Sequence, residues 1–449
     1  MDAAVNTLTS KAELAFAETF ERVKAELPGA EQVLVRELRS EAIRAFARTG
    51  LPNRRVEEWK YTDLYARLDD AFGPLVGDGV EVRRDDVLGA LGARLAGLDC
   101  HLIVLVDGRL APGLSDLDFL GDRGELLDMA AALAAPPAWL EARLADGESA
   151  AQNAVLYLNT ALMSDGVALR VAAGASVEKP IHIVHLHAAK TPVGISTRHV
   201  MVLEKGARAS VLESHVGLST TPAQHNVASD VSLAEGAVMH HLKIQQETEG
   251  ATHLSTWRIA LAESAAYDAF QFVGGSGLTR NEIHLGFAGE NARADVNGVF
   301  MGASGQHIDT TMFVDHAVAN CQSRMLFKGV LDDEARGVFQ GKIMVRQAAQ
   351  KTDSKEMVQG LLLSERAEFD SKPELEIFAD DVVCGHGSTS GQIDEDLLFY
   401  LRARGIGELE ARSILIQAFA GEALELIANE TIREALGETV RGWLAQRVA

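Results

Sequence analysis

The middle of the chain repeats a short phrase about every 30 residues. An acidic or glycine-bearing pair, then alanine, then a short strand pattern recurs between residues 151 and 390, as in "EKGARASV", "AEGAVM" and "GENARADV". The repeated alanines are Ala175, Ala207, Ala237, Ala265, Ala292, Ala335 and Ala367. A period of this length is typical of solenoids, in which each repeat packs only on its neighbours.

The segments between these alanines predict strands. "IHIVHLH", "DVSLAEGAVMHHLKIQQE" and "GVFQGKIMV" alternate between apolar and polar residues, and no long helical pattern intervenes. Strands without crossover helices can bury one face by coiling into a β-helix, which exposes edges only at its two ends. A β-sandwich with coincidental spacing is the alternative. Because the phrase repeats as well as the spacing, we predict a mainly β protein with a β-helix core over residues 151–392.

Helical patterns flank this core. "SKAELAFAETFERVKAEL" places Ser10 and Glu13 at capping-box spacing, and "EQVLVRELRSEAIRAFARTG" stops at Gly50. Residues 76–150 mix strand and helix patterns, and "GELEARSILIQAFAGEALELI" is helical again. We predict an N-terminal helical and mixed region over residues 1–150 and a C-terminal helical domain over residues 393–449. Such helices could cap the solenoid edges, and the C-terminal ones could present an apolar face to a partner.

Charge and composition exclude several function classes. The 42 basic and 64 acidic residues give a net charge of −22, which repels polyphosphate and argues against nucleic-acid binding. No segment approaches the roughly 20 apolar residues of a membrane helix, and the N-terminus lacks a leader-like pattern. Three distant cysteines do not indicate a disulfide framework. We therefore expect a cytoplasmic protein.

The stretch "CGHG" carries the main chemical signal. Residues two apart on a strand point to the same face, so Cys384 and His386 are expected side by side. Gly385 and Gly387 would let another backbone or a ligand approach. Thiolate and imidazole are ligands for iron, zinc or an iron–sulfur cluster, but two ligands do not close a metal site. A nucleophile–base pair is a second interpretation. A third interpretation assigns the pair no chemistry: the thiol is a buried core residue and the histidine lies on the surface.

Other chemical signals are weak. Thirteen of the 14 histidines follow residue 180, but their alternation in "IHIVHLH" and in His240–His241 indicates strand-surface residues rather than ligands. No HExxH, GxSxG or GxxxxGK[ST] motif occurs, so the chain is not expected to hydrolyse ATP.

Longer motifs resemble a known family. "TDSK", "LLLSERAEFDSKPELEIFADDV", "CGHGSTSGQIDED" and "FYLRARGI" follow one another between residues 351 and 422, and together resemble the C-terminal signature of the SufB/SufD family. "RRVEEWKYTDL" resembles the corresponding N-terminal segment of SufD proteins, although "EMVQGLLLS" differs from the family's Asn-rich run. The family's SufB branch is expected to carry further cysteines, including a CxxC-type cluster. The chain lacks them, so it resembles SufD more than SufB.

The resemblance implies a fold and a site. It implies a right-handed parallel β-helix in a complex with SufB and the SufC ATPase, which assembles iron–sulfur clusters with sulfur from a cysteine desulfurase. His386, with Cys384 beside it, is expected to face SufB and to bind the nascent, transient cluster. The complex is also associated with reduced flavin (FAD), for which no residues can be assigned. The chain itself is expected to be a scaffold subunit rather than an enzyme.

The resemblance also implies a docking region, and alternatives remain. SufC is expected to dock on the C-terminal helical domain, with candidate contacts at Leu401, Arg402, Gly405, Ile406, Arg412 and Phe419. A SufB-like homodimer that pairs two CxHG motifs across a two-fold axis is one alternative. A β-helix enzyme that acts on polysaccharides is another, although such enzymes are usually secreted.

Overall fold

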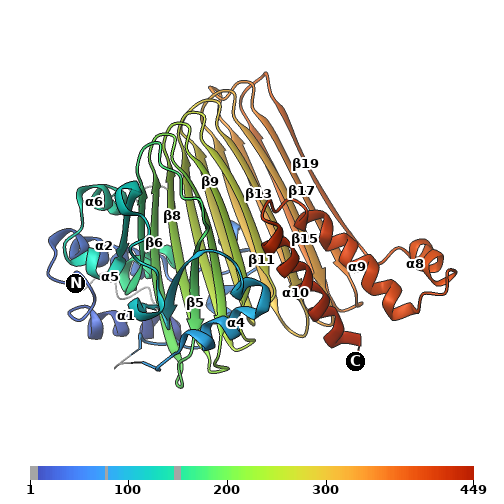
Figure 1. The fold of residues 1–449 in the computed structure, drawn as a ribbon, viewed down its shortest axis with the longest axis horizontal. Helices are drawn as coiled ribbons and strands as arrows, with labels where there is room; N and C mark the ends of the chain where they lie inside the picture. The colour runs from blue at the N-terminus through green and yellow to red at the C-terminus, as the bar shows by residue number, and fades with distance from the viewer. Residues whose placement is uncertain (1–8, 76–78, 146–152, 449) are drawn as a thin grey trace.

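The computed structural model describes residues 9–75, 79–145 and 153–448. Within these ranges the strands form a ten-stranded sheet, in the order β19-β17-β15-β13-β11-β9-β7-β5-β1-β2, and a nine-stranded sheet, in the order β18-β16-β14-β12-β10-β8-β6-β4-β3. From β4 onward, odd and even strands lie in different sheets because the chain crosses between the sheets after every strand (Figure 1). The predicted parallel β-solenoid is confirmed, and the β-sandwich alternative is excluded.

The strands are long and parallel. The ten-stranded sheet contains β1 (His101–Val106), β2 (Arg109–Leu110), β5 (Ile181–His187), β7 (Arg208–Gly217), β9 (Val238–Gln246), β11 (Ala266–Val273), β13 (Arg293–Gly302), β15 (Gln322–Leu331), β17 (Asp353–Leu362) and β19 (Val383–Gly391). The nine-stranded sheet contains β3 (Gly124–Asp128), β4 (Asp165–Val171), β6 (Val193–Leu203), β8 (Ala223–Leu233), β10 (Ala251–Leu261), β12 (Leu278–Phe287), β14 (His307–His316), β16 (Arg336–Val345) and β18 (Glu368–Ile377). The antiparallel strands β2 and β3 end the two sheets on the N-terminal side.

The repeated alanine marks a corner of each coil. Ala207 and Ala237 are fully buried, and each follows a glycine with positive φ, 69° at Gly206 and 67° at Gly236. Ser264 and Asn291 adopt the same left-handed conformation in later coils. Glycine adopts it without steric penalty, and asparagine more readily than most residues. The phrase therefore repeats because each coil needs one left-handed turn and one small buried side chain.

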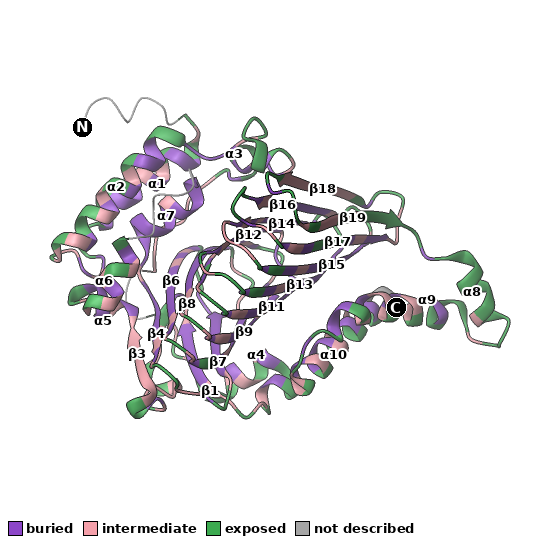
Figure 2. Cartoon of the chain, turned by 90° about the horizontal axis from the view of Figure 1, so that it is seen from above, coloured by how far each residue is buried: buried purple, intermediate pink, exposed green. Residues whose placement is uncertain are grey.

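Most of the helices lie over the outer faces of the sheets, whereas α8 projects away from them and packs on α9 (Figure 2). They are α1 (Lys11–Val23), α2 (Val33–Thr49), α3 (Leu64–Arg67), α4 (Arg84–Ala96), α5 (Met129–Ala134), α6 (Ala138–Ala145), α7 (Ala154–Leu162), α8 (Glu395–Arg402), α9 (Glu408–Leu424) and α10 (Glu430–Val448). The predicted capping box of Ser10 and Glu13 begins α1, and Gly50 with positive φ ends α2. None of the described helices is long and apolar enough to span a membrane.

Helix α7 and the C-terminal helices cover opposite sheets, whereas α4 of the N-terminal region packs on β7, in the sheet that the C-terminal helices cover. In the N-terminal region, α7 packs on α2 and on β6 and β8 of the nine-stranded sheet. In the C-terminal region, α9 packs on β13 and β15 of the ten-stranded sheet, and α10 contacts α4. The C-terminal helices thus cover the face of a sheet rather than its last strand. Among the described residues, no strand pairs with the outer side of β18 or β19.

Candidate functional site

Cys384 and His386 lie on β19, the last strand of the ten-stranded sheet. In the register with β17, Cys384 pairs with Ser354 and His386 pairs with Glu356. Paired residues of parallel strands point to the same side, and Cys384 packs against the apolar core between the sheets. Both side chains therefore belong to the inner face of the last coil, where His386 is exposed and Cys384 is half-buried. Burial raises the pKa of the Cys384 thiol, so the free thiol is protonated at neutral pH.

Glu356 is a third polar group at this site, and the sequence analysis missed it. Its side chain is 2% exposed, and neither carboxylate oxygen has a hydrogen-bond partner. Desolvation raises the pKa of this carboxyl to about 8. The carboxylate reaches across the interior to Gly341 on β16, where a Cβ atom would lie 2.0 Å from Glu356 Oε2. The one available signal was that Glu356 has the same inward parity as Ser354. That parity can be assigned only when the register of the strands is known.

The glycines of the motif face outward. Gly385 pairs with Lys355, and an added Cβ at Gly385 would meet nothing within 4 Å. At Gly387, an added Cβ would come within 2.7 Å of Met357 Cε. The backbone of β19 is thus bare on its outer face at Gly385, as the sequence analysis expected. A second chain or a ligand could approach it there.

A groove of about 740 Å³ runs along the outer face of the ten-stranded sheet to this strand. Its apolar floor includes Phe270, Leu326 and Met357, and residues 426–429 between α9 and α10 form its wall. Asp268, Asp295, Arg324 and Lys355 form a row of charges along it, one on each of four successive odd strands. A groove of this size fits a small organic molecule or a peptide segment.

The predicted docking residues fall into two groups. Leu401 and Ile406 pack partly against the helical core, and Phe419 lies under the Lys328 ammonium, 4.4 Å from the ring centre. Arg402 ends α8 and forms an ion pair with Glu408, and Gly405 has a positive φ in the turn before α9. Arg412, in α9, is half-buried. The apolar side chains that α8 and α9 expose are instead Leu397, Phe399, Tyr400, Leu409 and Ile414.

The histidines of the strands are mostly buried, contrary to the surface positions that we expected. His185, His199, His215, His225 and His253 are each 3% exposed or less. They face the interior because they share the inward parity of residues such as Ile183 and Val211. His240 and His241 point to opposite faces, as expected, since His241 is buried and the His240 side chain is 42% exposed.

The other cysteines do not join the CxH pair. Cys100, Cys321 and Cys384 are all free thiols. Cys321 is buried in the apolar core, and Cys100 lies near His182, 4.0 Å from its Nδ1. The expectation that the chain has no disulfide framework is therefore confirmed for the described residues.

Comparison with known proteins identifies relatives over the whole fold. Residues 185–419 match the family model described as "SUF system FeS cluster assembly, SufBD core domain", and residues 10–183 match "SufBD protein N-terminal region". The chain is 32% identical to the iron–sulfur cluster assembly protein SufD of Escherichia coli, over 86% of this chain and 88% of that protein. It is 30% identical to a SufBD family protein of Synechocystis, over 93% of each chain, and 24% identical to SufD of Bacillus subtilis, over 65% and 67%.

Proposed function

The chain belongs to the SufBD family of iron–sulfur cluster assembly proteins, and from this premise we propose that it is the SufD-like subunit of a SufBCD complex. It pairs with SufB to form the site where the cluster is built, and it carries the SufC ATPase on its C-terminal helices. Its role is that of a scaffold without catalytic activity of its own, because ATP hydrolysis belongs to SufC. Sulfur reaches the complex from a cysteine desulfurase.

The observation that carries this proposal is the position of the CxH pair. Cys384 and His386 lie on the inner face of an edge strand whose outer side pairs with no strand of the described residues, and they offer two ligand atoms. A second chain that docks on this edge can supply the remaining ligands of a shared cluster. The cluster is cargo here, and few ligands suit a site that must release it. An imidazole in place of a thiolate makes the cluster less negative, which raises its reduction potential.

The edge of the solenoid offers a docking surface for SufB. Strands β18 and β19 have free backbone groups on their outer sides, which are a template for pairing with another chain. Ile377, Phe378 and Val383 are exposed around these strands, with Phe378 and Val383 each 63% exposed. Burial of apolar side chains at a free edge supports an interface, and SufB, as a member of the same family, can present a matching edge.

The helices over residues 393–449 are the proposed docking unit for SufC. Phe399, Tyr400 and Leu409 are exposed on α8 and α9, which is the apolar surface that a partner would cover. Nucleotide binding by SufC could shift the two helical units between arrangements and thereby open or close the shared site. Any reduced flavin belongs to the complex, and we assign no residue of this chain to it.

A SufB-like homodimer is the second candidate. The same free edge, with the same Cys384 and His386, is present on every copy of the chain, so two copies could pair these strands around a two-fold axis. The mass of the purified assembly, with and without SufB, separates the two candidates. A polysaccharide-active enzyme has nothing in its favour beyond the solenoid.

The test is reconstitution of the three-subunit complex. The chain is co-expressed with SufB and SufC, purified, and supplied with iron and sulfide under anaerobic conditions. We expect a stable complex whose cluster absorbance is lost in His386→Ala but kept in His284→Ala, a half-buried histidine on the other sheet. A cluster that is unaffected by His386→Ala and by Cys384→Ser would overturn the shared-site proposal.

A further inference from the structure

The interior of the first coils is polar in one half. Along β5 to β10, residues such as Ile183, Val211 and Trp257 fill one half of the space between the sheets. The other half holds buried histidines, lysine and carboxylates: His185, His199, His215, His225, His241, Lys243, Glu213, Glu247 and His253. Buried polar groups normally have hydrogen-bond partners, and an unpartnered one requires an explanation such as a bound ion. These residues are remote in sequence from the CxH pair on β19.

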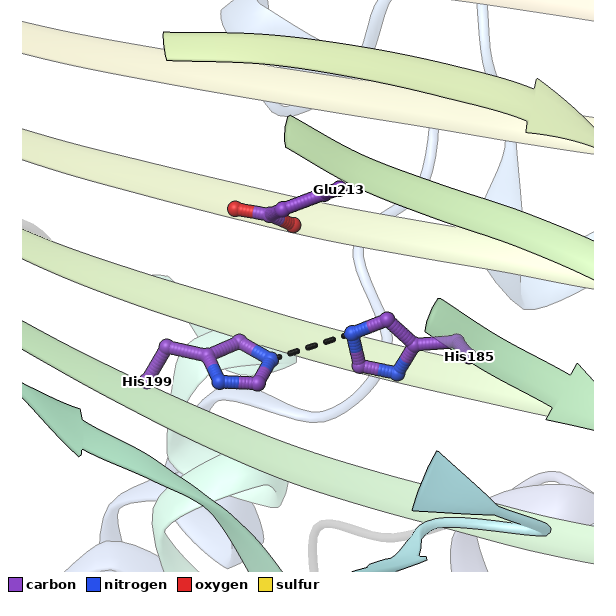
Figure 3. Close-up of side chains that lie close together, drawn as sticks. All are labelled: His185, His199 and Glu213. Atoms are coloured by element: carbon purple, nitrogen blue, oxygen red, sulfur yellow. Dashed lines mark hydrogen bonds between the residues drawn. The ribbon is translucent and has the colours of Figure 1, made fainter. Parts of the chain in front are cut away.

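One cluster in this half cannot offer all three of its ligand atoms to a metal ion. His185, His199 and Glu213 offer ligand atoms within 4.8 Å of one another (Figure 3). The backbone N–H of Val167 donates to His199 Nδ1 at 3.1 Å, so the neutral ring carries its proton on Nε2. That Nε2 lies 3.1 Å from His185 Nε2 and donates to it. Because a backbone N–H can only donate, His199 Nε2 stays protonated and cannot bind a metal ion.

The neighbouring cluster has unused ligand atoms. His215, Glu247 and His253 also offer one atom each within 4.8 Å of one another. Among the described residues, both ring nitrogens of His215 and Glu247 Oε1 lack a hydrogen-bond partner, whereas His253 Nδ1 lies 2.9 Å from Glu247 Oε2. Both ring nitrogens of His225 lack one too, and His225 Nε2 lies 3.4 Å from Glu247 Oε1. A neutral imidazole must donate at one nitrogen and accept at the other, so these rings are unsatisfied.

The geometry suits a small tetrahedral ion. Donor atoms around tetrahedral zinc lie about 3.4 Å apart, because each metal–nitrogen or metal–oxygen bond is about 2.0–2.1 Å long. The separation between His225 and Glu247 already has this value. The rings of His215 and His253 meet edge to face with their centres 4.7 Å apart, and each offers a ligand atom within 4.8 Å of the other and of Glu247.

The charges also favour a cation. Two carboxyl groups lie in this half of the interior, since Glu247 is 6% exposed and Glu213 is fully buried. Glu213 Oε2 lies 3.7 Å from His215 Nε2. Against these two carboxylates stands Lys243, whose Nζ lies 2.7 Å from His253 Nε2 and 2.8 Å from Asn281 Oδ1. Two buried negative charges against one buried positive charge leave an excess that a divalent cation can balance.

From this arrangement we infer that the solenoid interior binds a divalent transition metal ion through His215, Glu247 and His253, with His225 as the fourth ligand. Imidazole with one carboxylate is a ligand set for Zn²⁺, Fe²⁺ or Co²⁺ and not for Mg²⁺ or Ca²⁺. Lys243 Nζ donates to His253 Nε2, so the neutral ring carries its proton on Nδ1. A metal ion that binds Nδ1 displaces this proton, so binding releases one proton. The site is separate from the proposed cluster site and does not depend on it.

The test uses the full chain with the edge pair removed. A background of Cys384→Ser with His386→Ala excludes metal bound at β19, so a failure of one site does not resemble a failure of the other. The chain is produced with Zn²⁺ or Co²⁺ in the growth medium, because a fully enclosed site is filled during folding, and is purified with a chelator. We expect about one metal ion per chain by elemental analysis, and Co²⁺ bands of a tetrahedral site without thiolate charge transfer.

Single variants then locate the ion. His215→Gln and Glu247→Gln should each lower the retained metal at least fivefold, and His316→Gln, an equally buried histidine in a distant coil, should retain it. Circular dichroism checks that each variant is folded, and Glu247→Gln replaces His215→Gln if the latter does not fold. Retention of metal in both site variants, or no metal in the parent chain, would overturn the inference. In the second case the interior polar groups bind water instead.

Discussion

His386 and Glu356 face each other in register on the last two strands of the ten-stranded sheet. The imidazole is exposed at the free edge, whereas the carboxyl group is enclosed one strand further in, with no hydrogen-bond partner. The last coil therefore exposes an imidazole at the free edge and encloses behind it a carboxyl group whose raised pKa keeps it uncharged at neutral pH. An unpartnered buried carboxyl destabilises a fold, and we propose that Glu356 has a role in the site that offsets this cost.

Glu356→Gln tests this role. The amide has the same shape and cannot ionise, so we expect an unchanged or higher thermal midpoint at pH 8, where the native carboxyl starts to ionise in an apolar site. Cluster occupancy of the reconstituted complex should fall severalfold, because the oxygen that can bind iron is replaced. Absorbance and iron content measure it. Glu376→Gln, on the half-exposed surface of β18, should change neither quantity, and equal occupancy in both variants would contradict the role.

Phe378→Asp tests the docking surface at the solenoid edge. Phe378 is 63% exposed directly after β18, and burial of such a side chain contributes about 1.5–3 kcal/mol. Its replacement by a charge should weaken SufB binding roughly 10- to 100-fold, as measured by titration calorimetry. Leu218→Asp changes a 50% exposed leucine after β7 and serves as the control, for which we expect unchanged affinity. Equal effects of the two substitutions would place the interface elsewhere.

Phe399→Asp separates docking from packing on the C-terminal helices. Phe399 is 72% exposed on α8, so this change should weaken SufC binding at least tenfold and leave the thermal midpoint unchanged. Phe419→Ala should do the opposite, because its ring packs under Lys328 and against the helical core. We expect it to destabilise the chain by about 2–3 kcal/mol. Normal SufC binding by Phe399→Asp would show that SufC docks on another face.

The repeat made the architecture predictable. Each coil requires a left-handed corner and a small buried residue. The pair Gly-Ala at 206–207 and at 236–237 meets both requirements and is visible in the sequence. Helix caps at Ser10 and Gly50 depend on local residues and were equally readable. The packing direction of the C-terminal helices could not be predicted. It depends on contacts such as that of Lys328 with Phe419, two residues that are 91 positions apart in the sequence.

The polar interior was not predictable from local patterns. A histidine on a strand points inward or outward according to a parity that shifts at every corner, so "IHIVHLH" alone does not decide the burial of His185. Its neighbours His199 and His215 come from the next two strands along the chain, and only the register brings them together. Glu356 was missed for the same reason: it is found by its pairing with His386, not by its sequence neighbours.

Buried neutral histidines predict that the chain loses stability in acid. His316 is fully buried, donates or accepts one hydrogen bond with Ser323, and stacks on Phe287 with ring centres 4.3 Å apart. Desolvation lowers its pKa to about 4. Between about pH 6.5 and pH 4 the unfolded state binds a proton that the folded state rejects, so the free energy of unfolding falls as pH falls.

His316→Gln isolates this contribution, because glutamine does not titrate. The wild-type chain should lose on the order of 2–3 kcal/mol more than the variant between pH 6.5 and pH 4, as measured by urea unfolding at each pH. The loss comes from the unfolded state, so it should be absent above pH 7, where both chains are neutral at this position. His240→Gln, with a half-exposed side chain, should keep the wild-type slope. If His316→Gln kept the wild-type slope, the folded wild-type chain would have to bind a proton at His316. That would require water or a rearrangement at the buried stack on Phe287, and it would contradict the prediction.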